Sequence, residues 1–198
     1  MLSGLTGCVA LLPVKGFSEA KRRLAPALGP SERADFARSM ADHVLDAAAP
    51  LRVAVVCDDH DVAVWANERG AIVLEEPGLG LNGAVTAGVD ALARAGANEV
   101  LVVHADLPLA SGLAGLAGFG GVTLVPDRRD DGTNVCSVPA RAGFRFSYGP
   151  SSFVRHRAEA ERLGLAVRVV REPLLAWDVD VPSDIPAGLA GYDASTNG

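Results

Sequence analysis

The chain is short of several residue types, and each shortage narrows what it can be. Only two of its eighteen basic residues are lysines, Lys15 and Lys21. The formal net charge of −6 argues against non-specific binding to nucleic acid, which normally requires a basic face. No apolar run approaches the roughly 18 residues of a membrane span, and no charged segment followed by an apolar stretch opens the chain. We therefore expect neither nucleic acid nor a membrane as a partner.

Cysteines and aromatic residues are also scarce. Cys8, Cys57 and Cys136 are odd in number and far apart, which gives neither a disulfide framework nor metal-ligand spacing. We interpret them as small buried residues of a reduced compartment, and we expect a cytoplasmic protein. Its 198 residues are enough for one domain with its own core, ending in a loose polar tail over 192–198.

Apolar runs alternate with helical patterns along most of the chain. This order predicts an α/β fold with helices on both faces of a sheet. The sheet should be mixed and mostly parallel, because some strands of the second half follow one another without a long crossover. Strands are expected at 9–14, 51–57, 71–74, 100–103, 121–126, 135–138, 165–170 and 174–180. Four helices are expected. The first opens at Pro30-Ser31-Glu32 with Ser31 as its N-cap, and the second runs through Trp65 to Asn67. The third and fourth span 82–95 and 151–163.

Two groups of carboxylates are candidates for metal binding. Asp106 follows the β-branched run 100–103, at the end of a strand where open α/β sheets place ligands, and a carboxylate there suits Mg²⁺. A helix N-cap ahead of Pro108 explains Asp106 equally well. In a strand, Asp178 and Asp180 would share one face and repel each other unless a cation lay between them. The alternative is that Asp180 caps the turn that follows.

Three other segments are candidates for binding anions. Lys15, Lys21, Arg22 and Arg23 follow the first strand, and the flexible ammonium of a lysine suits a polyphosphate, although a solvated basic loop fits as well. The remaining two are a loop with exposed amides around Gly132 and Thr133, and the helix N-terminus after Gly149, where Ser152 adds a donor. An ordinary hairpin turn and plain N-capping are the alternatives for these two.

The other polar residues give weaker signals. Asn82 lies at a loop-to-helix junction, and its amide would serve either as an N-cap or as a reader of a purine edge. We interpret His43 and His60 as bystanders and His104 as structural or part of a site wall. Neither a P-loop, nor a dinucleotide-binding glycine fingerprint, nor a Ser-His-Asp set is present.

Taken in order, short segments along nearly the whole chain resemble the family that includes 2-phospho-L-lactate guanylyltransferase and phosphoenolpyruvate guanylyltransferase of coenzyme F420 biosynthesis. These segments are Pro13-Val-Lys15, Ala20-Lys-Arg-Arg-Leu24, Leu81-Asn82, His104-Ala-Asp106-Leu-Pro108, 127–134, Phe146–Phe153 with His156, and Asp178-Val-Asp180. Each segment is short, but the ordered set is specific. Arg22 stands where a small residue is common, and the sequence offers no account of Trp177.

The resemblance implies a nucleotide-diphosphosugar-transferase-like α/β sandwich of three layers. It also implies transfer of GMP from GTP to a small phosphorylated three-carbon acid, with release of pyrophosphate. By resemblance, Asp106, Asp178 and Asp180 would hold Mg²⁺. The catalytic and nucleotide-binding residues would be Lys15, Lys21 and Arg23, with Asn82 on the nucleotide, and the acid would be bound by Thr133, Gly149 and Ser152.

Bacterial members of that family generally use phosphoenolpyruvate, which we take as the expected substrate. Alternatives are 2-phospho-L-lactate and 3-phosphoglycerate, a molybdopterin-type nucleotidyltransferase, a glycosyltransferase and a non-catalytic nucleotide-binding protein. A downstream F420 transferase is a candidate partner. A homodimer through a strand edge or through residues 109–121 is left open by the sequence.

Overall fold

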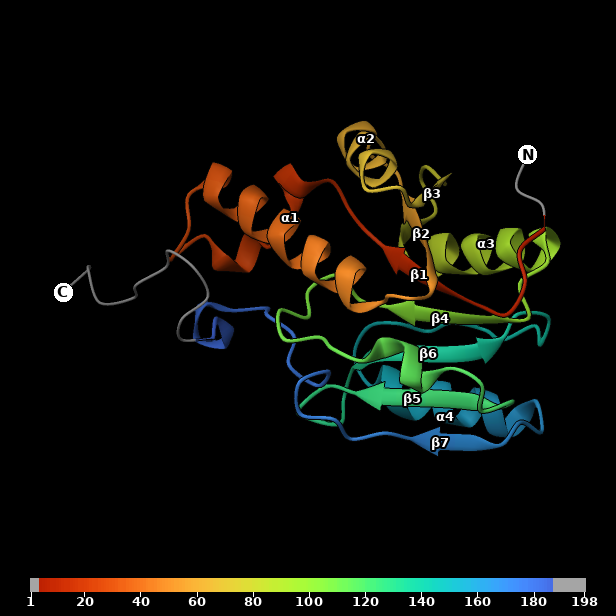
Figure 1. Ribbon diagram of the computed structural model, residues 1–198. Helices are drawn as coiled ribbons and strands as arrows, with labels where there is room; N and C mark the ends of the chain where they lie inside the picture. Colours follow the sequence, from red (N-terminus) through yellow and green to blue (C-terminus); the bar gives the residue numbers. More distant parts are fainter. Residues whose placement is uncertain (1–3, 187–198) are drawn as a thin grey trace.

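Seven strands line up in one sheet, in the order β3-β2-β1-β4-β6-β5-β7, in this computed structural model, which describes residues 4–186 (Figure 1). Strand β6 runs antiparallel to both of its neighbours, and every other pair is parallel. The strands are β1 (Cys8–Pro13), β2 (Arg52–Cys57), β3 (Ile72–Glu75), β4 (Glu99–Val103), β5 (Val122–Pro126), β6 (Thr133–Pro139) and β7 (Val167–Val169). The prediction of a mixed, mostly parallel sheet is confirmed.

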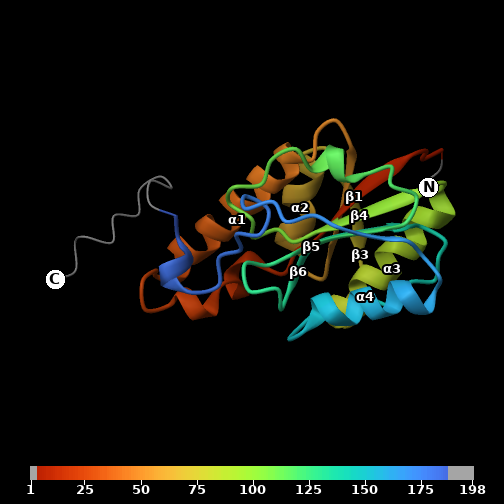
Figure 2. The same ribbon diagram turned by 90° about the horizontal axis from the view of Figure 1, so that it is seen from below.

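Four α-helices complete a three-layer sandwich (Figure 2). They are α1 (Pro30–Ala47), α2 (His60–Glu68), α3 (Gly80–Ala95) and α4 (Ser152–Arg162). Buried side chains of α1 and α2 pack on one face of the sheet, and those of α3 and α4 pack on the other. Because successive strand residues point to opposite faces, Leu11 joins one core cluster and Leu12 joins the other.

The register of the central strands creates one functional edge. Pro13 at the end of β1 pairs with Val56, and Leu11 pairs with Val102 of β4, so the loops after β1 and β4 leave the sheet side by side. Strand β6 runs the other way and therefore begins at this edge, where His104 N–H donates to the Asn134 carbonyl over 3.0 Å. Segments from three distant parts of the sequence meet there.

The last expected strand, 174–180, is not formed. Residues Leu175 and Ala176 instead donate backbone hydrogen bonds to the Glu172 carbonyl, which makes a turn. The segment then crosses the carboxyl ends of the strands, because Val179 N–H donates to the Asp106 carbonyl over 3.2 Å and Asn134 Nδ2 donates to the Leu175 carbonyl over 3.0 Å. The strand prediction, and with it the argument that Asp178 and Asp180 share a strand face, is wrong.

The N-cap of α1 is a smaller correction. Gly29 occupies that position, and its N–H donates to the Glu32 carboxylate over 2.7 Å. Pro30 begins the helix, where its missing N–H is no loss, so Ser31 lies inside the first turn. Capping comes from Glu32 reaching back rather than from Ser31.

Two expectations about burial and hydropathy can be compared with the structure. Cys57 and Cys136 are buried as expected, whereas Cys8 is half-buried. Within residues 4–186, no helix combines the length and the apolar character needed to cross a bilayer. The expected loose tail, 192–198, lies outside the described residues.

Candidate active site

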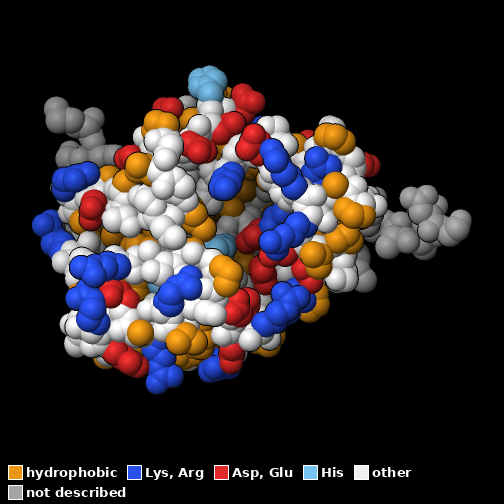
Figure 3. All heavy atoms as spheres, turned by 180° about the vertical axis from the view of Figure 1, so that it is seen from behind, with side chains coloured by type: hydrophobic (Ala, Val, Ile, Leu, Met, Phe, Trp, Pro, Cys, Tyr) orange, Lys and Arg blue, Asp and Glu red, His pale blue; other side chains and the backbone are white. Residues whose placement is uncertain are grey.

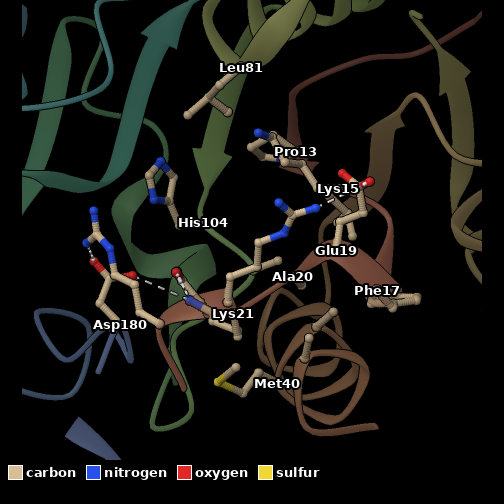
Figure 4. Close-up of a pocket in the computed structure, with 17 residues that line it drawn as sticks. Pro13, Lys15, Phe17, Glu19, Ala20, Lys21, Met40, Leu81, His104 and Asp180 are labelled. Atoms are coloured by element: carbon tan, nitrogen blue, oxygen red, sulfur yellow. Dashed lines mark hydrogen bonds and ion pairs between the residues drawn. The ribbon is translucent and has the colours of Figure 1, made fainter. Parts of the chain in front are cut away.

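A cavity of about 400 Å³ opens at the carboxyl edge of the sheet, between the loop after β1, helix α1 and the residues that follow β4. In Figure 3, basic and acidic side chains gather around a hollow on this molecule. Figure 4 shows the lining side chains pointing toward one another from elements far apart in sequence. Five of the predicted residues line it: Lys15, Lys21, Arg23, Asp106 and Asp180.

Lys21 is the central cation of this site. Its ammonium lies 2.6 Å from Asp106 Oδ2, 2.6 Å from the Val179 carbonyl oxygen and 3.7 Å from Asp180 Oδ1. The backbone at Lys21 is left-handed, with φ of 53°, at the start of the short 3-10 helix Arg22–Leu24. Only 12% of the Lys21 side chain is exposed, so the interpretation as a solvated basic loop fails for this residue.

The other cations of the loop lie nearer to solvent. Arg23 is 76% exposed, and its guanidinium lies 3.5 Å from Asp180. Arg22, equally exposed, also lines the cavity and pairs there with Glu19 at 3.7 Å. Lys15 is exposed on the cavity wall, and Gly16 beside it is required because a Cβ there would lie 2.6 Å from Asp59 Oδ2. The loop is thus packed closely against the start of α2.

Asp106 and Asp178 differ in their electrostatics. Burial raises the pKa of Asp106, but the charge of Lys21 and the hydrogen bond from Lys21 outweigh it, so that its pKa is lowered overall. Burial, followed by the charge of Asp106, raises the pKa of Asp178. Among residues 4–186 no cation pairs with the Asp178 carboxylate. The site therefore holds more negative charge than Lys21 and Arg23 neutralise.

The described residues include no ready-made cluster of three acidic, histidine or cysteine side chains at metal-ligand spacing, and Lys21 lies against Asp106 instead. Asp106 Oδ1 is nevertheless buried without a hydrogen-bond partner among residues 4–186. The charge of Asp106 also helps to raise the pKa of the Asp178 carboxylate. An unpartnered carboxylate oxygen with a second carboxylate nearby suits a hard divalent cation. The donor set is thus suited to a divalent metal ion.

His104 forms part of the cavity wall, and Tyr148 packs against it. His104 lines the cavity, and its ring lies 4.9 Å from that of Tyr148. His104 Nε2 and the Tyr148 hydroxyl are both buried without a partner within the described chain. Burial lowers the pKa of His104, so the imidazole is neutral near pH 7. The sequence left its role between structure and site wall, and the structure places it on the wall.

Thr133, Ser152 and His156 form a buried polar cluster beside the cavity. Ser152 Oγ donates to Thr133 Oγ1 over 3.4 Å, and His156 Nδ1 lies 3.1 Å from the same Thr133 oxygen. His156 Nε2 accepts from the Ser147 N–H over 2.9 Å, which makes Nδ1 the protonated nitrogen that donates to Thr133. Burial, with the nearby charges of His104 and Arg155, lowers the pKa of His156 to about 4.

Gly149 joins this cluster through the backbone. Its φ of 116° favours glycine, and its carbonyl accepts from the Ser152 N–H over 3.1 Å at the start of α4. Ser151 N–H donates to Asp131 Oδ1 over 2.9 Å, which fastens the loop before β6 to the same helix end. The three predicted acid-binding residues are thus brought together, although none of them lines the 400 Å³ cavity itself.

Asn82 is neither the N-cap of α3 nor free to contact a ligand in this conformation. The helix begins at Gly80, with Leu79 at the N-cap position. Asn82 Oδ1 accepts from the Tyr148 N–H over 2.6 Å, and Nδ2 donates to the Tyr148 carbonyl over 3.3 Å. Its amide therefore holds the backbone of Tyr148, whose ring packs against that of His104.

Sequence reasoning missed a second polar cluster, made of Arg128, Trp177 and Asp184. The Arg128 guanidinium stacks 4.0 Å from the Trp177 ring centre and lies 2.9 Å from Asp184 Oδ1. Trp177 Nε1 donates to the Asp184 carbonyl over 2.7 Å, which explains the aromatic residue that the sequence did not. The one signal available beforehand was Pro182-Ser-Asp184, where an acidic residue two positions after proline indicates a capped turn.

Known proteins of this architecture define its class. A protein from Desulfovibrio desulfuricans G20 that is assigned to the nucleotide-diphospho-sugar transferases has a TM-score of 0.70 and 17% identity, covering 88% of this chain and 82% of its own. The fold is therefore that of the nucleotide-diphospho-sugar-transferase-like α/β proteins.

The sequence relatives narrow the class to a family. The family described as Guanylyl transferase CofC like matches residues 8–191, and the chain belongs to it. A phosphoenolpyruvate guanylyltransferase of Sphaerobacter thermophilus is 39% identical, with 96% of this chain and 97% of that protein covered. A 2-phospho-L-lactate guanylyltransferase of Methanothermobacter thermautotrophicus is 35% identical, with 89% and 81% covered. The expected family, and with it a nucleotidyltransferase enzyme, is confirmed.

Proposed function

We propose that the protein transfers GMP from GTP to phosphoenolpyruvate and releases pyrophosphate, as a step in coenzyme F420 biosynthesis. The observation that carries this proposal is the contact of Lys21 with Asp106 and Asp180 in a cavity at the carboxyl edge of the sheet. Cations and carboxylates on one wall suit a substrate that is a polyphosphate with its metal ion. The family supplies guanylyl transfer as the reaction.

GTP would occupy the 400 Å³ cavity, with its triphosphate along the loop after β1. Lys15 and Arg23 are exposed on that wall and reach the cavity without breaking a buried contact. Lys21 lies deeper, where its ammonium is able to follow charge that moves to the leaving group. Asn82 would act in one of two ways. Its amide would contact the base after releasing the Tyr148 backbone, or it would act indirectly by keeping that backbone in place.

The acid substrate would lie toward Thr133, Gly149 and Ser152. The N-terminus of α4 presents the positive end of the helix dipole to a carboxylate or phosphate. The unpartnered Nε2 of His104 lies on the wall between this cluster and the cavity, and neutral His104 donates a hydrogen bond there without adding charge. The two anionic substrates thus approach from opposite sides of Asp106.

The reaction that fits is an in-line displacement. A phosphate oxygen of the acid attacks the α-phosphorus of GTP, the new bond to that oxygen forms, and the bond to the β-phosphate bridging oxygen breaks. The nucleophile is already ionised, so no general base is needed. Lys21 and Lys15 stabilise the charge that develops on the departing pyrophosphate, and the walls hold two mutually repelling anions in line.

Asp106, Asp178 and Asp180 would hold Mg²⁺. The bound ion would neutralise phosphate charge and orient the α-phosphate. Asp106 would contribute its unpartnered Oδ1, and the bound ion would balance the charge of Asp178. Lys21 keeps the backbone of Val179 in place beside these carboxylates.

The choice of acid rests on the relatives. The relative with 39% identity carries the phosphoenolpyruvate name, and the one with 35% identity carries the 2-phospho-L-lactate name. We take phosphoenolpyruvate as the substrate and 2-phospho-L-lactate as the alternative to be tested.

The deciding experiment is pyrophosphate release from GTP and Mg²⁺, with phosphoenolpyruvate, 2-phospho-L-lactate or 3-phosphoglycerate offered separately. A parallel set includes the downstream transferase and its deazaflavin acceptor, which traps a labile product. Release with phosphoenolpyruvate alone supports the proposal. Release with another acid alone replaces the substrate, and silence with all three in both formats overturns the assignment.

A further inference from the structure

The carboxylates Asp178 and Asp180 lie on a segment that has no secondary structure of its own. The residues between Leu175 and Val181 belong to neither helix nor strand. The sheet reaches this segment through the Val179 N–H, which donates to the Asp106 carbonyl over 3.2 Å. The Lys21 ammonium also donates to the Val179 carbonyl and pairs with Asp180. These contacts do not set the backbone direction at Asp180, whose carboxylate repels those of Asp178 and Asp106.

Asp184 is the residue that fixes it. Its Oδ2 accepts from the N–H groups of Asp180 and Val181, each over 3.0 Å. Its Oδ1 accepts from Arg128 over 2.9 Å, and its carbonyl accepts from Trp177 over 2.7 Å. The residue is 4% exposed, so these contacts are shielded from water. Both carboxylate oxygens are already occupied, which leaves Asp184 a support for the segment rather than a ligand.

Arg128 extends the support to the opposite side of the site. Its guanidinium stacks on Trp177, pairs with Asp184 and donates to the Asp178 carbonyl over 3.2 Å. Arg128 belongs to the loop between β5 and β6, whose shape Asp127 sets by accepting from three backbone N–H groups of that loop. The same loop delivers Thr133 at the start of β6. One planar cation therefore joins the acidic segment to the segment of the acid-binding residues.

We propose that Asp184, together with Arg128, is a positioning residue that holds the Asp178–Asp180 segment against Asp106 for divalent-cation binding. This rests on the proposed function only in placing the metal at these carboxylates. Asp184 sets the backbone direction at Asp180, and Arg128 sets the distance between the segment and the 127–134 loop. The enzyme thus uses an ion pair outside the reacting groups, with Asp184 buried and Arg128 partly exposed, to shape its metal site.

Asp184→Asn tests this with three readouts on the full chain. Without metal, hydrogen exchange of the peptide that contains Asp180 and Val181 should speed up, because their acceptor weakens. Mn²⁺ affinity, measured by electron paramagnetic resonance without substrates, should fall by about tenfold or more. The Mg²⁺ concentration for half-maximal pyrophosphate release should rise similarly, while kcat at saturating Mg²⁺ recovers to within about threefold.

The chain offers a matched control in Asp130→Asn. Asp130 lies in the same loop and pairs with Arg171 at 3.0 Å, but 52% of its side chain is exposed and it does not contact the acidic segment. All three readouts should match the wild type in this variant. Arg128→Lys keeps the charge and loses the planar stack on Trp177, and it should weaken Mn²⁺ binding by about threefold.

The outcomes separate the inference from the proposed function. An Asp184→Asn protein that melts earlier but binds Mn²⁺ with wild-type affinity assigns Asp184 a purely structural role and overturns the inference. If Asp184→Asn fails to fold, Arg128→Lys decides by the same Mn²⁺ criterion. Wild-type Mn²⁺ binding that Asp106→Asn leaves unchanged places the metal elsewhere and overturns both, whereas absent pyrophosphate release with intact, Asp184-dependent Mn²⁺ binding overturns the proposed reaction alone.

Discussion

The two sides of the candidate site are built in different ways. Asp106 and the loop of Lys15 and Lys21 leave the ends of β4 and β1, whose ladder hydrogen bonds fix where those segments begin. The segments 127–132 and 177–181 are irregular and are fixed by side chains, chiefly Asp127, Arg128 and Asp184. A strand end is positioned by many backbone contacts, whereas an irregular loop depends on a few side chains. Substitutions remote from the reacting groups should therefore damage the second side more.

The largest expected effect is at the strand-borne carboxylate. Asp106→Asn should lower pyrophosphate release by about 10²–10³-fold or more, because a neutral amide neither balances Lys21 nor binds a divalent cation as tightly. Since β4 and its ladder remain, circular dichroism should show the wild-type spectrum. Near-normal turnover would remove Asp106 from the metal site.

Substitutions of Lys21 and Lys15 should both lower activity, but only that of Lys21 should lower stability substantially. Lys21→Met leaves the Asp106 carboxylate, 23% exposed, without its partner, and should cost about 3 kcal/mol of the free energy of unfolding as well as most of the activity. Lys15→Met removes an exposed cation and should change that free energy by less than about 0.5 kcal/mol while lowering activity. Urea denaturation measures the first quantity, and equal stability losses in both variants would contradict the depth assigned to Lys21.

The contribution of the region held by side chains to the free energy of unfolding should depend on pH. His156 is fully buried, and its pKa is lowered to about 4 from an ordinary 6.5, so the unfolded chain binds a proton that the folded chain refuses between these values. His156 thus makes stability fall as the pH drops from about 6.5 to about 4, by about 3 kcal/mol in total.

His156→Gln should remove that dependence from the urea-denaturation profile between pH 7 and pH 4, while His43→Gln, at an exposed position of α1, should keep it. Identical slopes in wild type and His156→Gln would show that the ring is not held neutral. The hydrogen bond that Nε2 accepts from the Ser147 N–H, which needs an unprotonated nitrogen, would then lose its physical basis.

The smallest expected effect is a gain. Because burial and the charge of Asp106 raise the pKa of Asp178, its ionised form is disfavoured in the fold at neutral pH. Asp178→Asn should therefore raise the free energy of unfolding by about 0.5–1 kcal/mol and lower activity, as expected where charge is concentrated for function. Thermal melting at pH 7 compares the variant with wild type. A loss of stability would indicate that Asp178 is already paired in solution.

Local pattern was a good guide to the regular part of the molecule. Apolar periodicity found α1, α3, α4 and the central strands because a buried strand or an amphipathic helix is encoded by neighbouring residues. It failed at 174–180, where an apolar run leads into Asp178-Val179-Asp180 but the backbone bonds to Asp106 and Asn134 instead of to a strand. The alternative that Asp180 caps the following turn also fails, because Asp184 accepts from the Asp180 N–H.

The sequence by itself determined the α/β order, the family and the residue types of the site, because these are properties of contiguous segments. Only the tertiary structure decided that Lys21 contacts Asp106, that His156 donates to Thr133 and that Arg128 joins Asp184 to Trp177. Each of these contacts joins residues that fold together only when β1, β4 and β6 place their loops at one edge of the sheet. Contacts between distant segments follow from the register of the strands, and no local pattern encodes them.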